Sequence, residues 1–240
     1  MAAGYATRLY PLTKEFPKPL LEVGGKPIIN HIIEKLSLVD EVKEVFVITN
    51  NKFFPKFREW LPGFKSLKKI TLINDRTKSN AARLGAIGDI NFALKDKRIK
   101  EDLLIIGGDN LFSGDLDKFV KFARAKSPGI TIGLYRLKNI KDASKYGVAR
   151  VDKKNRIIEF HEKPDKPNSP LAAMCLYYIP QERLKLIDTY MDIIRRKSDA
   201  TGNYIGWLTD KIKVYSFVFK GKWYDIGDRK YLISAKRDFA

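Results

Sequence analysis

The sequence predicts an α/β protein, a three-layer sandwich in which helices cover a mixed, mainly parallel central sheet. In the first half, short apolar runs alternate with segments of helical periodicity, as in strand–helix–strand crossover units. In the second half, the apolar runs are separated by short turn-like segments, which is typical of hairpins. No repeat, linker or low-complexity segment interrupts the chain, so its 240 residues are expected to form a single domain.

The predicted elements of the first half follow in order along the chain. The run EVFVIT (44–49) predicts a strand, and the segment after it has apolar residues at helical spacing. KITLIN (69–74) predicts a second strand, before a long mixed segment at 80–94. DLLIIGGD (102–109) is a third strand, before a helix at 113–126 with Ser113 or Asp115 as its cap. GITIGLYRL (129–137) predicts the next strand.

The second half combines predicted hairpins with helices. GVARVD and RIIEFHEK predict a hairpin over 147–163, and LAAMCLYYI a strand over 171–179. An amphipathic helix is predicted at 181–196. KIKVYSFVF and KWYDIG predict a second hairpin over 211–227, and a helix at 230–239 closes the sequence.

The composition predicts an anionic partner. Lys and Arg number 46 against 28 Asp and Glu, which gives a formal net charge of +18. Nucleic acid, a membrane surface and phosphorylated small molecules all fit such a charge, while the separate basic patches are interpreted as solvated faces. No apolar run is long enough for a membrane span, and the opening residues lack a signal-peptide core. Cys175 is the only cysteine, so an internal disulfide is excluded and a cytoplasmic location is expected.

The segment AAGYATRLYPLTKEFPKPLL has features of a phosphate-binding loop. Ala3 and Gly4 begin it, and a glycine lets backbone amides approach a phosphate closely. Arg8 and Lys18 add positive charge, and the prolines on both sides of Lys18 stiffen the backbone there.

The full run AAGYATRLYPLT…PKPLLEVGGKPII resembles the signature loop of the sugar-1-phosphate nucleotidylyltransferases. RLGAIGDI, GGDN, YGVARVDKKNRIIEFHEKP and KWYDIGD resemble further motifs of that family, in the family's order. The resemblance implies a Rossmann-like nucleotide-diphospho-sugar transferase fold over residues 1–240. The N-terminal half would bind the nucleotide and the C-terminal half the sugar phosphate. It also implies transfer of a nucleoside monophosphate from a nucleoside triphosphate, with UTP or dTTP favoured, to a sugar-1-phosphate, with release of pyrophosphate.

The resemblance assigns roles to the charged residues. Arg8 and Lys18 would clamp the triphosphate, and Asp109 with Asp225 would hold Mg²⁺, which prefers carboxylate and phosphate oxygens. Asp109 follows a strand, where open α/β sheets bind ligands. A turn or helix cap is the alternative interpretation of each aspartate.

The resemblance also implies two substrate-binding groups. Ala3, Gly4, Asn74 and Gly85 would contact the nucleotide, although a strand-end asparagine such as Asn74 is more often a turn former. The sugar-phosphate group comprises Tyr146, Gly147, Glu162 and Lys163. In that group Glu162 would accept hydrogen bonds from sugar hydroxyls and Lys163 would hold the phosphate; an ion pair at the surface is the alternative.

The sequence departs from the family pattern at two places. The family has a buried strand before the first loop, and the expectation is that a few native residues precede Met1. Ala6 stands where the family usually has glycine, which is acceptable at negative φ and costly at positive φ.

Two other functions remain open at this point. One is a CTP-dependent cytidylyltransferase acting on a polyol or choline phosphate. The other is a non-catalytic nucleic-acid-binding or regulatory protein on the same fold, which the net charge favours but the retained acidic and phosphate motifs disfavour. The sequence names neither the base nor the sugar, and it leaves the oligomeric state open.

Overall fold

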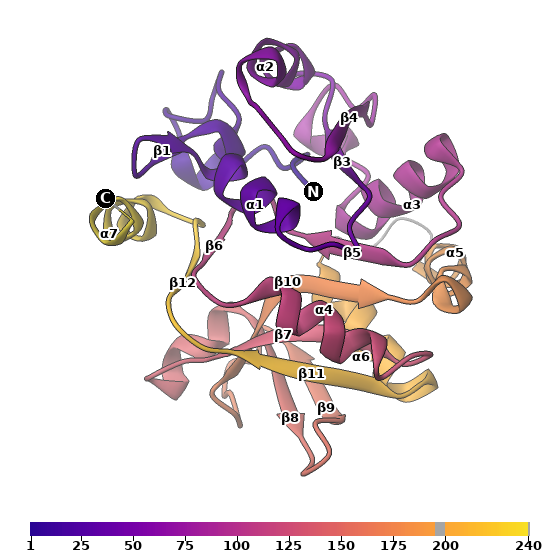
Figure 1. Ribbon diagram of the computed structural model, residues 1–240. Coiled ribbons are helices and arrows are strands. Elements are labelled where there is room, and N and C mark those ends of the chain that lie inside the picture. Colours follow the sequence, from indigo (N-terminus) through magenta and orange to yellow (C-terminus); the bar gives the residue numbers. More distant parts are fainter. Residues whose placement is uncertain (195–199, 240) are drawn as a thin grey trace.

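A six-stranded mixed sheet forms the middle of the molecule (Figure 1). The structure, a computed structural model, describes residues 1–194 and 200–239. The strands are β5 (Leu103–Ile106), β7 (Ile130–Arg136), β8 (Gly147–Val151), β9 (Ile157–Glu162), β10 (Leu171–Ile179) and β11 (Val214–Phe219). β10 is antiparallel to β5, β7 and β8, while β11 is parallel to β7. The predicted α/β fold with a mixed central sheet is confirmed, but the expectation that this sheet is mainly parallel is wrong, because β10 runs antiparallel to each of its three neighbours and β8 runs antiparallel to β9.

Short strands make up the remaining pairs. β3 (Glu44–Thr49) and β4 (Lys69–Asn74) are parallel to each other and form a separate sheet. β1 (Glu22–Val23) pairs with β2 (Lys26–Pro27), and β6 (Asn110–Phe112) pairs with β12 (Trp223–Asp225).

The N-terminal residues lie between β3 and β5. The Met1 nitrogen donates a hydrogen bond to the Ile106 carbonyl at 2.8 Å, and the Ala2 N–H donates to the Ile48 carbonyl at 2.8 Å. Met1 and Ala2 therefore connect the two sheets at one end of the gap between them.

Helices cover both faces of the main sheet, as the apolar stripe along a helix predicts. They are α1 (Ile28–Ser37), α2 (Phe54–Trp60), α3 (Ala86–Lys97), α4 (Leu116–Arg124), α5 (Lys185–Ile194), α6 (Thr201–Lys211) and α7 (Arg229–Asp238). Asp115, and not Ser113, caps α4, since its side chain accepts from the Lys118 N–H at 3.0 Å. The predicted helix at 181–196 begins as a 3₁₀ turn before α5, and positions 195 and 196 lie outside the described residues.

Two apolar clusters pack on opposite sides of the sheet. One includes α1 and α4, through residues such as Ile29 and Phe119. The other includes α3, α5 and α6, through residues such as Ile90 and Leu208. Successive residues of β5 divide between them, because Ile105 packs in the second cluster and Ile106 in the first. This alternation gives the three-layer arrangement.

The predicted second hairpin, over 211–227, is wrong. β11 adds to the main sheet beside β7, and β12 pairs instead with β6. Ser113 fixes this partner choice: its N–H donates to the Lys222 carbonyl at 2.9 Å, and its hydroxyl accepts from the Lys222 N–H at 2.8 Å. Ser113 and Lys222 are far apart in the sequence, so local strand propensity could not predict their contact. The pairing places Asp225 opposite Asn110.

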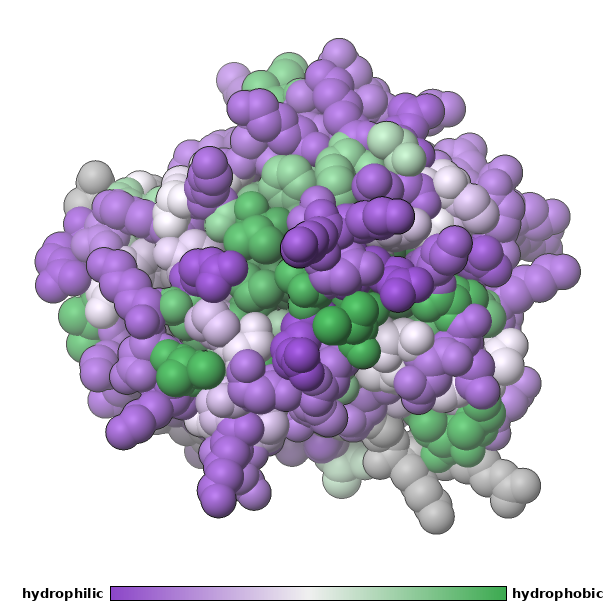
Figure 2. Space-filling model, turned by 90° about the horizontal axis from the view of Figure 1, so that it is seen from below, coloured by the Kyte–Doolittle hydropathy of each residue, from purple (hydrophilic) through white to green (hydrophobic). Residues whose placement is uncertain are grey.

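The face that carries the β8–β9 hairpin is predominantly hydrophilic, with small separate hydrophobic areas (Figure 2). Within the described residues, the helices are all too short or too polar to cross a bilayer.

Candidate active site

Asp109 lies immediately after β5 and contacts a lysine from the opening loop. The Lys18 Nζ is 2.5 Å from Asp109 Oδ2, and both side chains are largely buried. Lys18 begins a 3₁₀ turn between the buried Pro17 and Pro19, so its backbone position is well fixed. Burial by itself would raise the pKa of Asp109, yet the adjacent ammonium outweighs it and lowers that pKa.

Asp225 reaches the same place from the other end of the chain. The Ile226 N–H donates to the Asp109 carbonyl at 3.1 Å, which joins the two segments backbone to backbone. Burial, and then the charge of Asp109, raise the pKa of Asp225 to about 6; Lys18, Arg8 and Lys163 oppose this rise. The structure thus brings together two carboxylates and three cations that the sequence separates widely.

Arg8 reaches toward the acidic pair across a glycine. A Cβ built on Gly227 would lie 3.5 Å from the Arg8 guanidinium, an ordinary contact distance, so Arg8 lies next to the segment that follows Asp225. Arg8 itself is exposed, and its charge is available to a ligand anion.

The loop that begins at Ala3 is anchored by side-chain hydrogen bonds on one side and is exposed at Gly4. The Asn50 side chain donates to the Ala3 carbonyl at 2.8 Å, and Thr13 donates to the Ala6 carbonyl at 2.7 Å. Gly4 is exposed, and a Cβ on it would meet nothing within 4 Å. Ala6 has φ of 48°, the left-handed region where alanine is disfavoured by about 1 kcal/mol relative to glycine. The departure noted in the sequence therefore falls at a position of positive φ.

A small cavity of about 130 Å³ opens beside Asp225. Its lining includes the four predicted sugar-phosphate residues, Tyr146, Gly147, Glu162 and Lys163. The Tyr146 ring lies 5.1 Å from the Trp223 ring, measured between centroids, which braces this side of the cavity. The β8–β9 hairpin carries Gly147 and Glu162 as its last paired residues. Just beyond them, the Lys163 N–H donates to the Tyr146 carbonyl at 3.0 Å.

Glu162 is held by close packing as well as by charge. Its Oε1 is 3.6 Å from Lys163 Nζ; burial raises the pKa of Glu162, and Lys163 moderates the rise. A Cβ on Gly202, in the first turn of α6, would lie 1.8 Å from Glu162 Oε2. A Cβ on Gly147 would lie 2.5 Å from the Phe160 ring. The Phe160 ring therefore leaves no room for a side chain at Gly147, a packing reason that the sequence did not show, whereas a side chain at Gly202 would displace the Glu162 carboxylate.

Asn74, the last residue of β4, and Gly85, which precedes α3, lie outside this cluster. The Asn74 side chain donates to Asn51 Oδ1 at 2.8 Å and accepts from the Arg76 N–H at 2.8 Å, as a turn former does. Gly85 has φ of 79° and precedes α3, where a side chain would be strained.

The sequence did not indicate several lining residues. Lys145, Ala173, Tyr177, Thr201 and Gly202 join the cavity wall. The Tyr177 hydroxyl donates to Thr201 Oγ1 at 2.8 Å, which links β10 to α6. Only the pairing of β10 with its neighbours brings these positions together, so no local motif marks them.

Cys175 also lines the cavity. Burial, and then the charge of Asp109, raise the pKa of its thiol to about 12. The thiol is therefore protonated at neutral pH and is a poor nucleophile.

The comparisons with known proteins agree with this arrangement. The sequence profile described as "Nucleotidyl transferase" matches residues 1–240. The chain is 30% identical over 227 residues to the bifunctional protein GlmU of Methanocaldococcus jannaschii, covering 95% of this chain and 50% of the relative. It thus spans about half the length of the curated relatives it matches.

Solved structures share the fold. One, assigned as a glucose-1-phosphate thymidylyltransferase from Bacillus anthracis and bound to sucrose, has a TM-score of 0.84 at 24% identity, covering 99% of this chain and 92% of that one. An apo UDP-glucose pyrophosphorylase has a TM-score of 0.79 at 17% identity, covering 99% and 95%. The profile match over the whole chain shows that the protein belongs to the nucleotidyl transferase family.

Proposed function

We propose that the protein transfers a nucleoside monophosphate from a nucleoside triphosphate to a sugar-1-phosphate and releases pyrophosphate. The observation that carries this proposal is the convergence of Asp109 and Asp225 with Arg8, Lys18 and Lys163 beside a small polar cavity. A transfer between two phosphates needs this mixture of signs, because carboxylates hold a metal and cations hold the phosphates. The solved structures that share the fold are named as a glucose-1-phosphate thymidylyltransferase and a UDP-glucose pyrophosphorylase, and both names support the same reaction.

The acidic pair fits a divalent cation such as Mg²⁺. Asp109 and Asp225 are close enough that the charge of one raises the pKa of the other, and both are largely removed from water. Oxygen ligands of this kind suit Mg²⁺, which commonly takes one or two carboxylates together with substrate phosphates. When bound, the ion would neutralise charge on the triphosphate.

The first half of the chain is proposed to hold the triphosphate. Arg8 and Lys18 would balance its negative charge, and the open backbone at Ala3 and Gly4 would donate N–H groups to it. Asp109 would hold the metal, and Lys18, when it is not paired with Asp109, would contact phosphate. Gly85 and Asn74 are the proposed contacts to the nucleoside.

The second half is proposed to hold the acceptor. Lys163 would bind its phosphate, Glu162 would accept hydrogen bonds from its hydroxyls, and Tyr146 with Gly147 would shape the pocket. An oxygen of the acceptor's phosphate then forms a bond to the α-phosphorus of the nucleoside triphosphate. The bond from that phosphorus to the pyrophosphate oxygen breaks, and pyrophosphate leaves. No protein nucleophile is needed, so the residues act by positioning and by charge.

UTP or dTTP is the proposed nucleotide, and the cytoplasm the proposed location. Uracil and thymine differ by one methyl group, which a pocket distinguishes by only about 1–3 kcal/mol. Both nucleotides are therefore expected to react, at rates that differ within about two orders of magnitude.

A pyrophosphate-release assay tests the proposal. Each common nucleoside triphosphate is combined with sugar-1-phosphates, polyol phosphates and choline phosphate, with Mg²⁺ or with a chelator. Metal-dependent release with a sugar-1-phosphate is the expected result, and D225N is the inactive control. Release only with CTP and choline or polyol phosphate would overturn the sugar assignment. Absence of release, together with duplex binding that weakens steeply with salt, would overturn the enzymatic one.

A further inference from the structure

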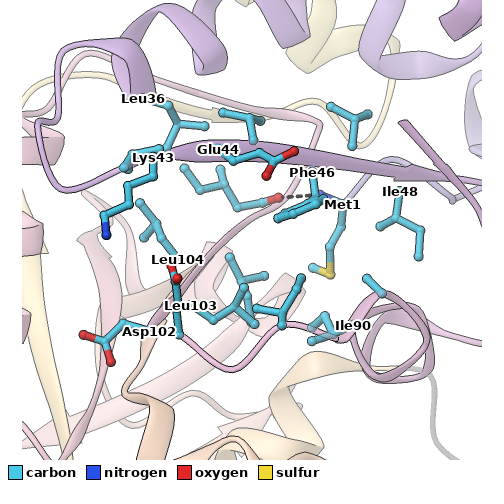
Figure 3. A pocket seen from close by; sticks show the side chains of 18 of the residues that line it. Met1, Leu36, Lys43, Glu44, Phe46, Ile48, Ile90, Asp102, Leu103 and Leu104 are labelled. Carbon is cyan, nitrogen blue, oxygen red and sulfur yellow. Dashed lines mark hydrogen bonds between the residues drawn. The ribbon is translucent and has the colours of Figure 1, made fainter. Parts of the chain in front are cut away.

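The residues proposed for the acceptor line the small cavity beside Asp225. A larger cavity, of about 1020 Å³, lies between β3 and β5, with Met1 at one end and charged side chains such as Lys43 and Asp102 at the other (Figure 3). Asp225 belongs to the lining of the small cavity and not to that of the large one. Contacts that fix the wall of the small cavity therefore bear on the proposed reaction.

The helix α7 begins shortly after Asp225 and packs beside β12 and β1 (Figure 1). Its first turn is capped, because the Asp228 side chain accepts from the Tyr231 N–H at 3.1 Å. Leu232 and Ala235 are buried in the apolar cluster that includes α1. The backbone of Tyr231 is therefore held both by the cap and by the apolar face of the helix.

The same turn contacts the opening loop. The Arg229 guanidinium donates to the Tyr10 carbonyl at 3.5 Å, and Arg8 lies next to Gly227. The start of α7 thus touches the half of the chain that is proposed to hold the triphosphate. Tyr231, in contrast, makes its side-chain contacts with the other half.

Tyr231 is the closest partner of Lys145, which lines the small cavity. The Lys145 Nζ donates to the Tyr231 hydroxyl at 3.4 Å and lies 5.6 Å from the centroid of the Tyr231 ring, a cation–π distance. This hydrogen bond raises the pKa of the Lys145 ammonium, because an accepting oxygen favours the charged form. The Lys145 side chain is 56% exposed and its ion pair with Asp142 is 3.8 Å long, so packing and charge alone fix it weakly.

Tyr146, the next residue of the cavity wall, also contacts Tyr231. Burial, and then a hydrogen bond with the Tyr231 hydroxyl, raise the pKa of Tyr146. A hydrogen bond that raises the pKa of a phenol is one that its neutral form donates. The Tyr231 oxygen therefore accepts from two consecutive residues of the wall, as a phenol oxygen can.

The position of Tyr146 in turn determines that of its neighbours in the pocket. Its carbonyl accepts from the Lys163 N–H at 3.0 Å, and its ring packs on the Trp223 ring. Movement of Tyr146 would therefore displace the segment that carries Lys163, the cation proposed to hold the acceptor's phosphate.

We propose that Tyr231 is a positioning residue for the sugar-phosphate acceptor: its hydroxyl holds Lys145 and Tyr146 at the wall of the small cavity. Tyr231 acts through these two residues and through Lys163, and it does not touch the reacting atoms. The kinetic consequence of this inference rests on the proposed function. The structural consequence, a fixed cavity wall, does not.

Y231F and Y231L test the kinetic consequence, with glucose-1-phosphate as the probe. Y231F removes the hydroxyl but keeps the ring beside Lys145, whereas Y231L removes both. The KM for glucose-1-phosphate is expected to rise about 3–10-fold in Y231F and further in Y231L, while the KM for the triphosphate changes by less than about twofold.

Y224F is the matched control. The Tyr224 hydroxyl bonds with Asp238 at the other end of α7, so Y224F removes a hydroxyl that holds the same helix without contacting Lys145 or Tyr146. Its KM for glucose-1-phosphate should equal that of the wild type. An equal rise in Y224F and Y231F would assign the effect to the docking of α7 as a whole and overturn the proposal.

Amide exchange tests the structural consequence without turnover. The Tyr146 N–H donates to the Ala143 carbonyl at 3.0 Å, and the Lys163 N–H to the Tyr146 carbonyl. Both amides should exchange at least about fivefold faster in Y231F than in the wild type, and at the wild-type rate in Y224F. Unchanged exchange in Y231F would overturn the assignment of Tyr231. Absence of pyrophosphate release by the wild type with every acceptor would instead count against the proposed reaction.

Discussion

Two hollows lined by the described residues differ in size and in chemistry. The small one, about 130 Å³, is lined by Glu162 and Lys163 and lies beside Asp225. The large one, about 1020 Å³, is lined mainly by apolar side chains and by the edges of β3 and β5. Volume would select the large hollow as the substrate site, but the small one has Asp225 in its lining, a carboxylate whose pKa responds to the charges of Asp109, Lys18, Arg8 and Lys163. The lining chemistry, and not the size, indicates what each hollow holds.

The largest expected effect comes from the acidic pair. D109N keeps the shape of the side chain but removes a charge proposed to hold the metal, and should lower turnover by at least about 10²–10³-fold. The measurement is pyrophosphate release at saturating Mg²⁺. D115N, which alters an exposed aspartate that caps α4, is the matched control and should retain full activity. Near-normal turnover of D109N would remove Asp109 from the mechanism.

The next largest effect distinguishes the roles of Lys163 and Arg8 toward the two substrates. K163Q should lower kcat/KM for the sugar phosphate by about 10–100-fold, with a smaller change for the triphosphate. R8Q should show the reverse, because each cation is assigned to a different anion. Kinetics with each substrate varied in turn would measure the split. Equal losses for both substrates in both variants would contradict the assignment.

A smaller effect is expected from crowding Glu162. G202A places a methyl group 1.8 Å from the present position of Glu162 Oε2, so that carboxylate must move. The KM for the sugar phosphate should rise about tenfold while the KM for the triphosphate is unchanged. The matched control is G206A on the same helix, whose added Cβ would meet its nearest neighbour at 3.7 Å, an ordinary contact. If G206A shows the same loss, the effect belongs to α6 and not to Glu162.

Local patterns predicted the fold well and long-range pairings poorly. Each apolar run predicted as a strand in the first half is a strand, and the 147–163 hairpin is present as β8 and β9. The second hairpin was wrong because β12 finds β6 through contacts of Ser113 with Lys222, more than 100 residues apart. Sequence spacing carries no information about such partners.

The candidate site divides in the same way. Lys18, Asp109, Glu162 and Lys163 lie in motifs that resemble those of the family, so the sequence alone could indicate them as candidates. Tyr177, Thr201 and Gly202 could not be found, because β10 and α6 meet only after the sheet has formed. The cavity between β3 and β5 could not be predicted either, because only the hydrogen bonds of Met1 to Ile106 and of Ala2 to Ile48 show how the two sheets lie next to each other.

The smallest effect is expected far from both hollows, at the cap of α4. The Asp115 carboxylate accepts from the Lys118 N–H at 3.0 Å, which satisfies one of the free N–H groups of the first turn. D115A should lower the free energy of unfolding by about 1 kcal/mol, while D115N, which keeps an acceptor, should change it by much less. Denaturant unfolding at pH 7 measures both.

The pH dependence of stability gives a second measure of what the Asp115 cap contributes. The hydrogen bond from Lys118 lowers the pKa of Asp115 in the folded state. The stabilisation by the charged carboxylate is therefore complete above the unfolded pKa, about 3.9, and is lost as the pH falls through the lower folded value. The difference between wild type and D115A should shrink as the pH falls below the unfolded pKa, and turnover at pH 7 and amide exchange in β3 and β5 should be unchanged. A change in turnover or in amide exchange would show that α4 is coupled to one of the two hollows. That hollow would then not be independent of this helix.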